Sequence, residues 1–463
     1  MEAHAMYSIT QDDHSTKCIS EKSNRFFQQY QIGKILKASN GNKMQGFSSI
    51  QILRLLFTMV FCHRSFFMQM NLHPASVPFG KDTVYRFLNS CHTNWRRFVL
   101  LLSGRIIRDT IEPLTDKKRQ NVLILDDSIF SRSRSKKVEL LAKLYDHANH
   151  VYTFGFRMLT LGWTDGNSFL PVNHCLLSTE NPKYRVNDAS PATDLRTNGD
   201  KQKAMAQQKM TDIAIHLLKE AKAERIPAHY VLFDSWFCSP SFLIAVKQLK
   251  YDVIAMVRKT VSQQYRHQGK WMNVKTIYER GKKRRGKAKI LLSVEAEAVK
   301  DGIIVPVRFV YVRNRAKKND YLVLVTTDMK LSEEEIVRLY GKRWSIEVFF
   351  KMCKSYLRLS KEYRSVSYDA MVAHVAIVFA RYMLLAVEQR ENRDMRSLGE
   401  LFYLSVDELP DIQYMDALRL ILARFAELIQ KKTVLEENEV LKLLDAFIEE
   451  LPSLWKYSLQ ICA

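Results

Sequence analysis

The sequence predicts an α/β protein in several parts, with a core of strands and helices between two helical regions. The chain has 463 residues, 47% hydrophobic and 26% charged, enough for more than one domain. Between residues 121 and 257, short apolar runs alternate with amphipathic segments in the order β-β-β-α-β-α-β. Before residue 103 and after residue 400, apolar residues instead return at helical spacing. This composition excludes a disordered chain and a fibrous repeat.

The charge balance indicates a polyanionic partner. Lys and Arg number 71 against 49 Asp and Glu, so the formal net charge is +22. Nucleic acid is the commonest partner of a large basic protein, because each cation that meets a phosphate releases a counterion. An anionic membrane surface and simple solubility remain alternatives. Charge does not distinguish binding DNA from cutting it.

The compartment is predicted from cysteines and apolar runs. The seven cysteines are scattered and form no CxxC pair, which is typical of free thiols in a reducing compartment. The first residues lack the basic and then apolar layout of a secretory signal. The longest apolar stretch, 372–387, contains His374 and Arg381 and is too short for a membrane span, so it predicts a buried helix. We therefore expect a cytoplasmic protein without a membrane partner.

Residues 1–115 are predicted to form a helical domain. Asp82 or Thr83 can cap a helix that begins at Val84. The segment KDTVYRFLNS is compatible with the DNA-contacting part of a helix-turn-helix. An ordinary helical domain with a solvated basic face is an equal alternative.

Residues 116–259 are predicted to form the first part of the core. We expect apolar strands at 121–126 and 229–233, each ending at an acidic residue. The other expected elements are strands at 151–163, 169–177 and 252–257, a helix at 200–225 and a helix after Pro240. The long helix that would complete this unit begins only after residue 330.

Residues 260–331 are predicted to form a β-rich insertion that carries a cationic loop. Its strand-like runs are 290–294, 303–312 and 321–327. The tract 279–289 has seven cations against one acid, which favours phosphate contact over a solvated hairpin tip. The cations that we assign to DNA are Lys282, Lys283, Arg284 and Arg285.

Residues 332–400 are predicted to form the last part of the core, beginning with a long helix. Ser332 and Glu335 have the spacing of a capping box, and the acids that follow Ser332 suit the positive end of the helix dipole. Residues 401–463 are predicted to form a C-terminal helical region.

Three acidic residues are candidate metal ligands. Asp126 and Asp234 end two strands that this order of elements makes neighbours, and Glu347 lies in the late helix. Clustered carboxylate oxygens are the ligands that Mg²⁺ or Mn²⁺ prefers. A single Asp after a strand often caps a turn instead, so the prediction depends on the three acids together.

A polar quartet surrounds the last of these acids. Tyr340, Arg343, Glu347 and Lys354 are separated by 3, 4 and 7 residues. At about 100° per residue they share one arc of a continuous helix, beside an apolar stripe. An exposed face joined by charge pairs at spacing four is the alternative. A Tyr and two cations around one acid favour a metal-binding carboxylate with a phosphate clamp.

The quartet's pattern, Y-x2-R-x3-E-x6-K, resembles the signature of the IS-four family of bacterial insertion-sequence transposases. These are DDE transposases, so the resemblance implies an RNase H-like core interrupted by the β-rich insertion. Trp344, Ile346 and Phe350 are also similar to the family's usual neighbours. The resemblance runs from about residue 121 to about residue 387 and is weak before 80 and after 400.

The resemblance also implies site roles. Asp126, Asp234 and Glu347 would be the catalytic residues and would hold two Mg²⁺ or Mn²⁺ ions, with Asp127 as the alternative first ligand. The remaining quartet residues, Tyr340, Arg343 and Lys354, would hold DNA-end phosphates. Some family members form a DNA hairpin intermediate, for which candidate base-stacking residues are Trp236, Trp271 and Trp344.

The implied function is that of a transposase. It would bind the inverted terminal repeats of an insertion sequence through its N-terminal domain, cut them with divalent metal and join them to a target. Double-stranded DNA would be the partner, and pairing of two ends implies a homodimer associated with the bacterial nucleoid. A related nuclease that does not join DNA and a catalytically silent DNA-binding relic remain alternatives.

Overall fold

The computed structural model describes residues 21–391, apart from positions 44, 63–76, 117–118, 148, 192–193, 287, 315–316, 318–319 and 363–364. The chain forms two compact units. The first comprises Met1–Arg25, Thr58–Arg64 and Met395–Ala463, and the second comprises Phe26–Phe57 and Ser65–Asp394. The predicted C-terminal helical region lies outside the described residues. Everything below concerns the second unit unless stated.

The N-terminal segment is helical where it is described. Its helices are α2 (Ile32–Ala38), α3 (Ser49–Thr58), α5 (Lys81–Leu88) and α6 (Trp95–Ile106), followed by the short turns η3 (Ile107–Ile111) and η4 (Glu112–Leu114). Helix α5 begins at Lys81 after the N-cap Gly80, so the predicted start at Val84 is wrong by one turn. Helix α6 contacts β4 and α13, and most of its residues are buried. Helix α5 carries most of the candidate DNA-contacting segment and leaves Lys81, Asp82 and Arg86 exposed, so the helix-turn-helix and the ordinary helical domain both stay predictions.

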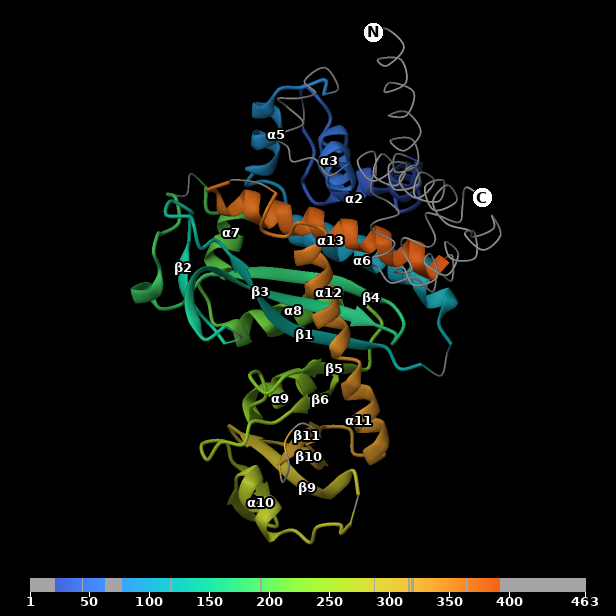
Figure 1. Cartoon of the computed structure of the whole chain (residues 1–463), viewed down its shortest axis with the longest axis vertical. Helices are drawn as coiled ribbons and strands as arrows, with labels where there is room; N and C mark the ends of the chain where they lie inside the picture. Colours follow the sequence, from blue (N-terminus) through green and yellow to red (C-terminus); the bar gives the residue numbers. More distant parts are fainter. Residues whose placement is uncertain are drawn as a thin grey trace, which may run out of the picture. The chain divides into compact units, whose positions relative to one another are not determined.

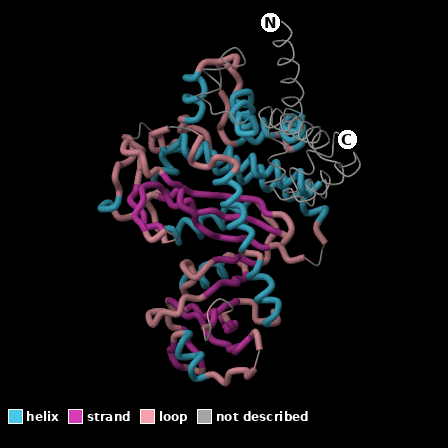
Figure 2. Tube along the Cα trace, in the orientation of Figure 1, coloured by secondary structure: helices cyan, strands magenta, loops and turns pink. Residues whose placement is uncertain are grey.

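The core is one large mixed sheet (Figures 1 and 2). Its first strands are β1 (Val122–Ser131), β2 (Ala142–Asp146), β3 (Val151–Thr164), β4 (Phe169–Leu177), β5 (Tyr230–Phe233) and β6 (Asp252–Met256). Strands β1, β5 and β6 are parallel neighbours, whereas β3 is antiparallel to both β1 and β4. This order is consistent with the RNase H-like core that the sequence resemblance implies.

The strands of the predicted insertion extend this sheet. They are β7 (Tyr265–His267), β8 (Lys270–Met272), β9 (Ile290–Lys300), β10 (Ile303–Arg313) and β11 (Tyr321–Thr326), with helix α10 (Val274–Arg280) between β8 and β9. The three predicted strand runs are confirmed as β9, β10 and β11. Because β11 pairs antiparallel with β6, the β-rich segment continues the core sheet.

Three predicted elements differ from the structure. Strand β1 continues five residues beyond Asp126, because it pairs with β3 as far as Ser131. The helix predicted at 200–225 is two helices, α7 (Asn198–Met205) and α8 (Met210–Ala223). The helix after Ser332 is also two, α11 (Glu333–Gly341) and α12 (Trp344–Ser355), although its capping box is present as predicted.

The remaining helices are α9 (Pro240–Gln248), the short turn η5 (Pro182–Tyr184) and α13 (Tyr368–Glu391). Helix α13 is long and apolar enough to cross a membrane, yet its apolar window is wholly buried inside the protein. Figure 1 shows it running beside α6, and both contact β4. Buried Arg381 forms two hydrogen bonds to Glu362, at 2.6 and 2.9 Å, so the helix belongs to a folded core.

Candidate active site

Strand register brings the first two predicted acids together. Leu125 of β1 pairs in parallel with Phe233 of β5, and this is the last pair between the two strands. The next residue on each chain is Asp126 and Asp234. Neighbouring strands lie about 4.8 Å apart, so Asp126, still within β1, and Asp234, directly after β5, lie side by side. Sequence reasoning anticipated this neighbourhood from the order of the elements.

Asp126 lies in a buried and negatively charged environment. Its Oδ1 accepts a hydrogen bond from the backbone N–H of Asp127 at 2.8 Å, and its Oδ2 accepts one from Arg343 at 2.7 Å. The pKa of Asp126 is raised to about 7, chiefly by burial and also by the charge of Asp234, against the lowering effect of Arg343. Burial therefore disfavours the charged form of Asp126, and a bound cation would favour it.

Asp127 has a different partner. Its Oδ2 accepts a hydrogen bond from Arg157 of β3 at 2.8 Å. Its charge also contributes to raising the pKa of Asp234, so both aspartates of β1 lie near the second acid. The choice between Asp126 and Asp127 as the first ligand stays open, although only Asp126 bonds to the guanidinium that also holds Glu347. Sequence reasoning missed Arg157, whose only signal was one cation in an apolar strand.

Asp234 is held by the turn that follows β5. Its Oδ1 accepts a hydrogen bond from the backbone N–H of Trp236 at 2.9 Å. Burial raises the pKa of Asp234, and the backbone hydrogen bond of Trp236 lowers it. The Trp236 side chain is 45% exposed. An acid at a strand end thus also serves as a turn cap here, which was the structural alternative for such residues.

Glu347 reaches Asp126 through Arg343. Helix α11 ends at Gly341, and the backbone N–H groups of Lys342 and Arg343 donate to carbonyls three residues back. This tighter turn separates α11 from α12, so the continuous helical arc predicted from the sequence is wrong in detail. Arg343 nevertheless donates to Glu347 at 2.5 Å and to Asp126 at 2.7 Å. One guanidinium therefore bridges acids of β1 and α12.

The other two quartet residues lie beside this bridge. The Tyr340 hydroxyl is buried without a hydrogen-bond partner among the described residues, and burial raises its pKa to about 12. The ring of Tyr340 lies 6.0 Å from the Arg343 guanidinium carbon. Lys354 donates to the hydroxyl of Ser128 at 2.5 Å, and burial lowers its pKa. Tyr340 therefore has a donor available for a further acceptor.

The acids do not form a ready metal group in this structure. Among the described residues, no three or more His, Cys, Asp or Glu side chains are placed to hold a metal ion. The guanidinium of Arg343 lies between Asp126 and Glu347, where it supplies positive charge. The donor set still fits Mg²⁺, because the carboxylates are hard oxygen ligands and Asp126 and Asp234 lie close enough for the charge of Asp234 to raise the pKa of Asp126.

The predicted cationic loop lies between α10 and β9, and Lys282, Lys283, Arg284 and Arg285 are exposed in it. Arg284 forms a bidentate pair with Glu333 of α11, at 2.7 and 2.8 Å. Lys283 donates to the carbonyl of Glu279 and lies 4.8 Å from the ring centroid of Tyr278. The DNA contacts of this loop stay a prediction, and Arg284 is already paired with Glu333.

The three candidate stacking residues are exposed. Trp236 is 45% exposed, Trp271 54% and Trp344 64%. Trp236 directly follows the Asp234 turn, and Trp344 begins α12 next to Arg343. Trp271 lies in β8, far along the sheet order from β1. Their stacking role stays a prediction.

Comparison with known protein families gives one match. Residues 55–302 match the model described as DDE superfamily endonuclease, which is just over half of the chain. The matched range includes Asp126 and Asp234 and ends before Glu347. Comparison with curated proteins finds no match. With Asp126 and Asp234 side by side on neighbouring parallel strands and a family match across both, the chain belongs to the DDE superfamily endonucleases.

Proposed function

We propose that this protein is a transposase that cuts the ends of a mobile DNA element and joins them to a target. The observation that carries the proposal is the bridge from Asp126 through Arg343 to Glu347, next to Asp234. Membership in the endonuclease superfamily supports phosphodiester cleavage on DNA. The match of the quartet to the transposase signature supports the finer assignment.

Asp126, Asp234 and Glu347 would hold the divalent cations, with two Mg²⁺ ions as the expected set. Bound Mg²⁺ supplies charge stabilisation at phosphate oxygens and lowers the pKa of a water or 3′-hydroxyl nucleophile. The protein's own part is to place Asp126 beside Asp234 and to link Glu347 to Asp126 through Arg343. This arrangement concentrates negative charge where a cation is needed.

Arg343, Tyr340 and Lys354 would position the DNA. Arg343 offers a planar fork of donors that suits a phosphate, and it can exchange a carboxylate for a phosphate oxygen. The buried Tyr340 hydroxyl lacks a partner among the described residues, so it can donate to a phosphate oxygen. Lys354 adds a point charge beside Ser128. Such contacts position the strand and carry no sequence information.

The test compares Glu347→Gln with Glu334→Gln. Glu334 is an exposed acid of α11 and provides a matched loss of one charge. The probe is a duplex with the DNA that flanks the coding region, incubated with Mg²⁺ or Mn²⁺. We expect Glu347→Gln to abolish cleavage while duplex binding stays within a few-fold, and Glu334→Gln to cut normally. Cleavage retained by Glu347→Gln would overturn the assignment of this acid.

A nuclease that does not join DNA is the second candidate, because the family match itself is to endonucleases. The two candidates differ in their products. A transposase converts pre-cut ends and a plasmid target into strand-transfer products, and a nuclease releases only cut ends. Crosslinking with end DNA tests the proposed homodimer, since joining requires two ends in one complex. Wild-type protein that neither cuts nor joins would indicate a silent DNA-binding relic.

A further inference from the structure

A cavity of about 720 Å³ lies at the edge of the sheet opposite the candidate active site. Asn121, His229 and Tyr251 line it, and each directly precedes one of the parallel strands β1, β5 and β6. The N–H of His229 donates to the carbonyl of Asn121 at 3.1 Å, so these strand starts form one row. From Asn121 to Asp126 the strand rises roughly 16 Å at its usual 3.3 Å per residue. The cavity is thus separate from the catalytic acids.

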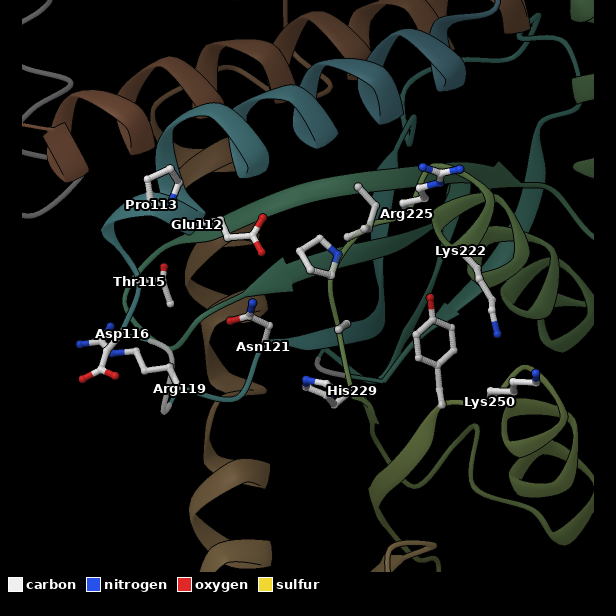
Figure 3. Close-up of a pocket in the computed structure, with 14 residues that line it drawn as sticks. Glu112, Pro113, Thr115, Asp116, Arg119, Asn121, Lys222, Arg225, His229 and Lys250 are labelled. Atoms are coloured by element: carbon white, nitrogen blue, oxygen red, sulfur yellow. The ribbon is translucent and has the colours of Figure 1, made fainter.

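Positive charge gathers on one wall of this cavity. Figure 3 shows Lys222, Arg225 and Lys250 together on one side and Asp116 with Arg119 on the other. Lys222 donates to the carbonyl of Leu249 and lies 5.5 Å from the ring centroid of Tyr251. Arg119 is 3.7 Å from Asp165. The wall opposite Arg119 is therefore cationic.

Arg225 and Lys250 are the cations with most freedom to bind. Among the described residues neither forms a hydrogen bond or ion pair through its side chain, and both are exposed. They follow the ends of α8 and α9 with φ of 59° and 62°. Helices usually place glycine at this left-handed position. Two successive helices instead place a long cation there, and both residues line the same cavity.

The floor of the cavity has a polar group without a partner. The Oδ1 atom of Asn121 is buried and has no hydrogen-bond partner among the described residues, and the same holds for Oε1 of the adjacent Gln120. Asn121 also lines the cavity, and its amide N–H groups are donors that suit an anion, whose charge the cations on the wall would balance.

We propose that this cavity binds a backbone phosphate of duplex DNA, one distinct from the phosphate that is cut. Pockets for small molecules are mostly apolar, whereas this one is lined chiefly by charged and polar side chains on flexible stems. Such a lining suits a phosphodiester, which needs charge and donors but no enclosing apolar surface. The identification of the polyanion as DNA rests on the proposed function. The site gives the protein a second contact with DNA, at the edge of the sheet opposite the candidate active site.

The test uses the full chain with Arg225→Gly and Lys250→Gly combined. Glycine suits a positive φ, so this variant should fold and melt at a slightly higher temperature than wild type. Duplex affinity is measured by fluorescence anisotropy at several salt concentrations. We expect the slope of log affinity against log salt to fall by about 0.9 in magnitude, the value for one phosphate contact. Mg²⁺-dependent cleavage at saturating protein should be unchanged.

The matched control is Lys201→Gln combined with Lys219→Gln, which removes two exposed cations of α7 and α8 outside the cavity. An unchanged slope in the control and a reduced slope in the glycine variant support the proposal. Equal slopes in both would overturn it. Wild-type stabilisation by millimolar inorganic phosphate, lost in the glycine variant without a change in DNA slope, would also overturn it in favour of a small-anion site. Wild-type protein that binds duplex without cutting it would defeat only the proposed function.

Discussion

Replacing Arg343 by Ala should reveal whether this side chain substitutes for metal charge. In the structure its guanidinium makes two charge-assisted hydrogen bonds, to Asp126 and to Glu347. A hydrogen bond to a charged group contributes about 1.5 to 3 kcal/mol, but Glu347 is partly exposed and regains water when the bond is lost. We therefore expect a loss of about 2 kcal/mol of unfolding free energy without metal. This corresponds to roughly 2 °C in melting temperature for a chain of this size.

Metal should reverse this loss. A divalent cation that binds the acids should stabilise the variant more than the wild type, because in the variant the cation has no guanidinium to displace. The assay is the melting temperature with and without Mn²⁺, and Arg338→Ala on the exposed side of α11 is the control. Equal Mn²⁺-induced shifts in wild type and in Arg343→Ala, or no loss without metal, would refute the reasoning. A control that behaves like Arg343→Ala would refute it as well.

Three further predictions concern stability and DNA binding. Arg381→Met should lower the unfolding free energy by about 3 to 5 kcal/mol, because Glu362 is left buried without its cation. Adding Glu362→Gln should recover part of the lost free energy, and no recovery would contradict the pairing. Burial lowers the pKa of His174 to about 3, so below pH 6.5 the unfolded chain binds a proton that the folded chain does not, and the unfolding free energy falls by about 2 kcal/mol at pH 5. The melting temperature of His174→Gln should fall less between pH 7 and pH 5 than that of wild type. An equal fall in both would contradict this cause. Lys282→Gln with Arg285→Gln should flatten the salt dependence of duplex binding by up to about 1.8 in slope, and an unchanged slope would remove the loop from the DNA interface.

The positions of Asp126 and Asp234 were predictable from the sequence, because a short apolar strand followed by Asp is a local pattern. Strands β9 to β11 and the start of α11 at Ser332 follow from the same local physics. The break after Gly341 was not predictable, since local dihedral angles stay helical there and only the hydrogen-bond pattern tightens. The continuation of β1 past Asp126 depends on β3, a partner about 30 residues away in sequence.

Residue types and spacing determined the superfamily, the charge class and the candidate acids of this protein, because those properties are carried by single side chains and short patterns. Tertiary structure decided which groups meet. The parallel register of β1 and β5 sets Asp126 beside Asp234, and the fold inserts Arg343 between Asp126 and Glu347. The same register gathers the strand starts around a cationic cavity at the other edge of the sheet. Such contacts depend on pairing between segments that are distant in sequence, which no local pattern encodes.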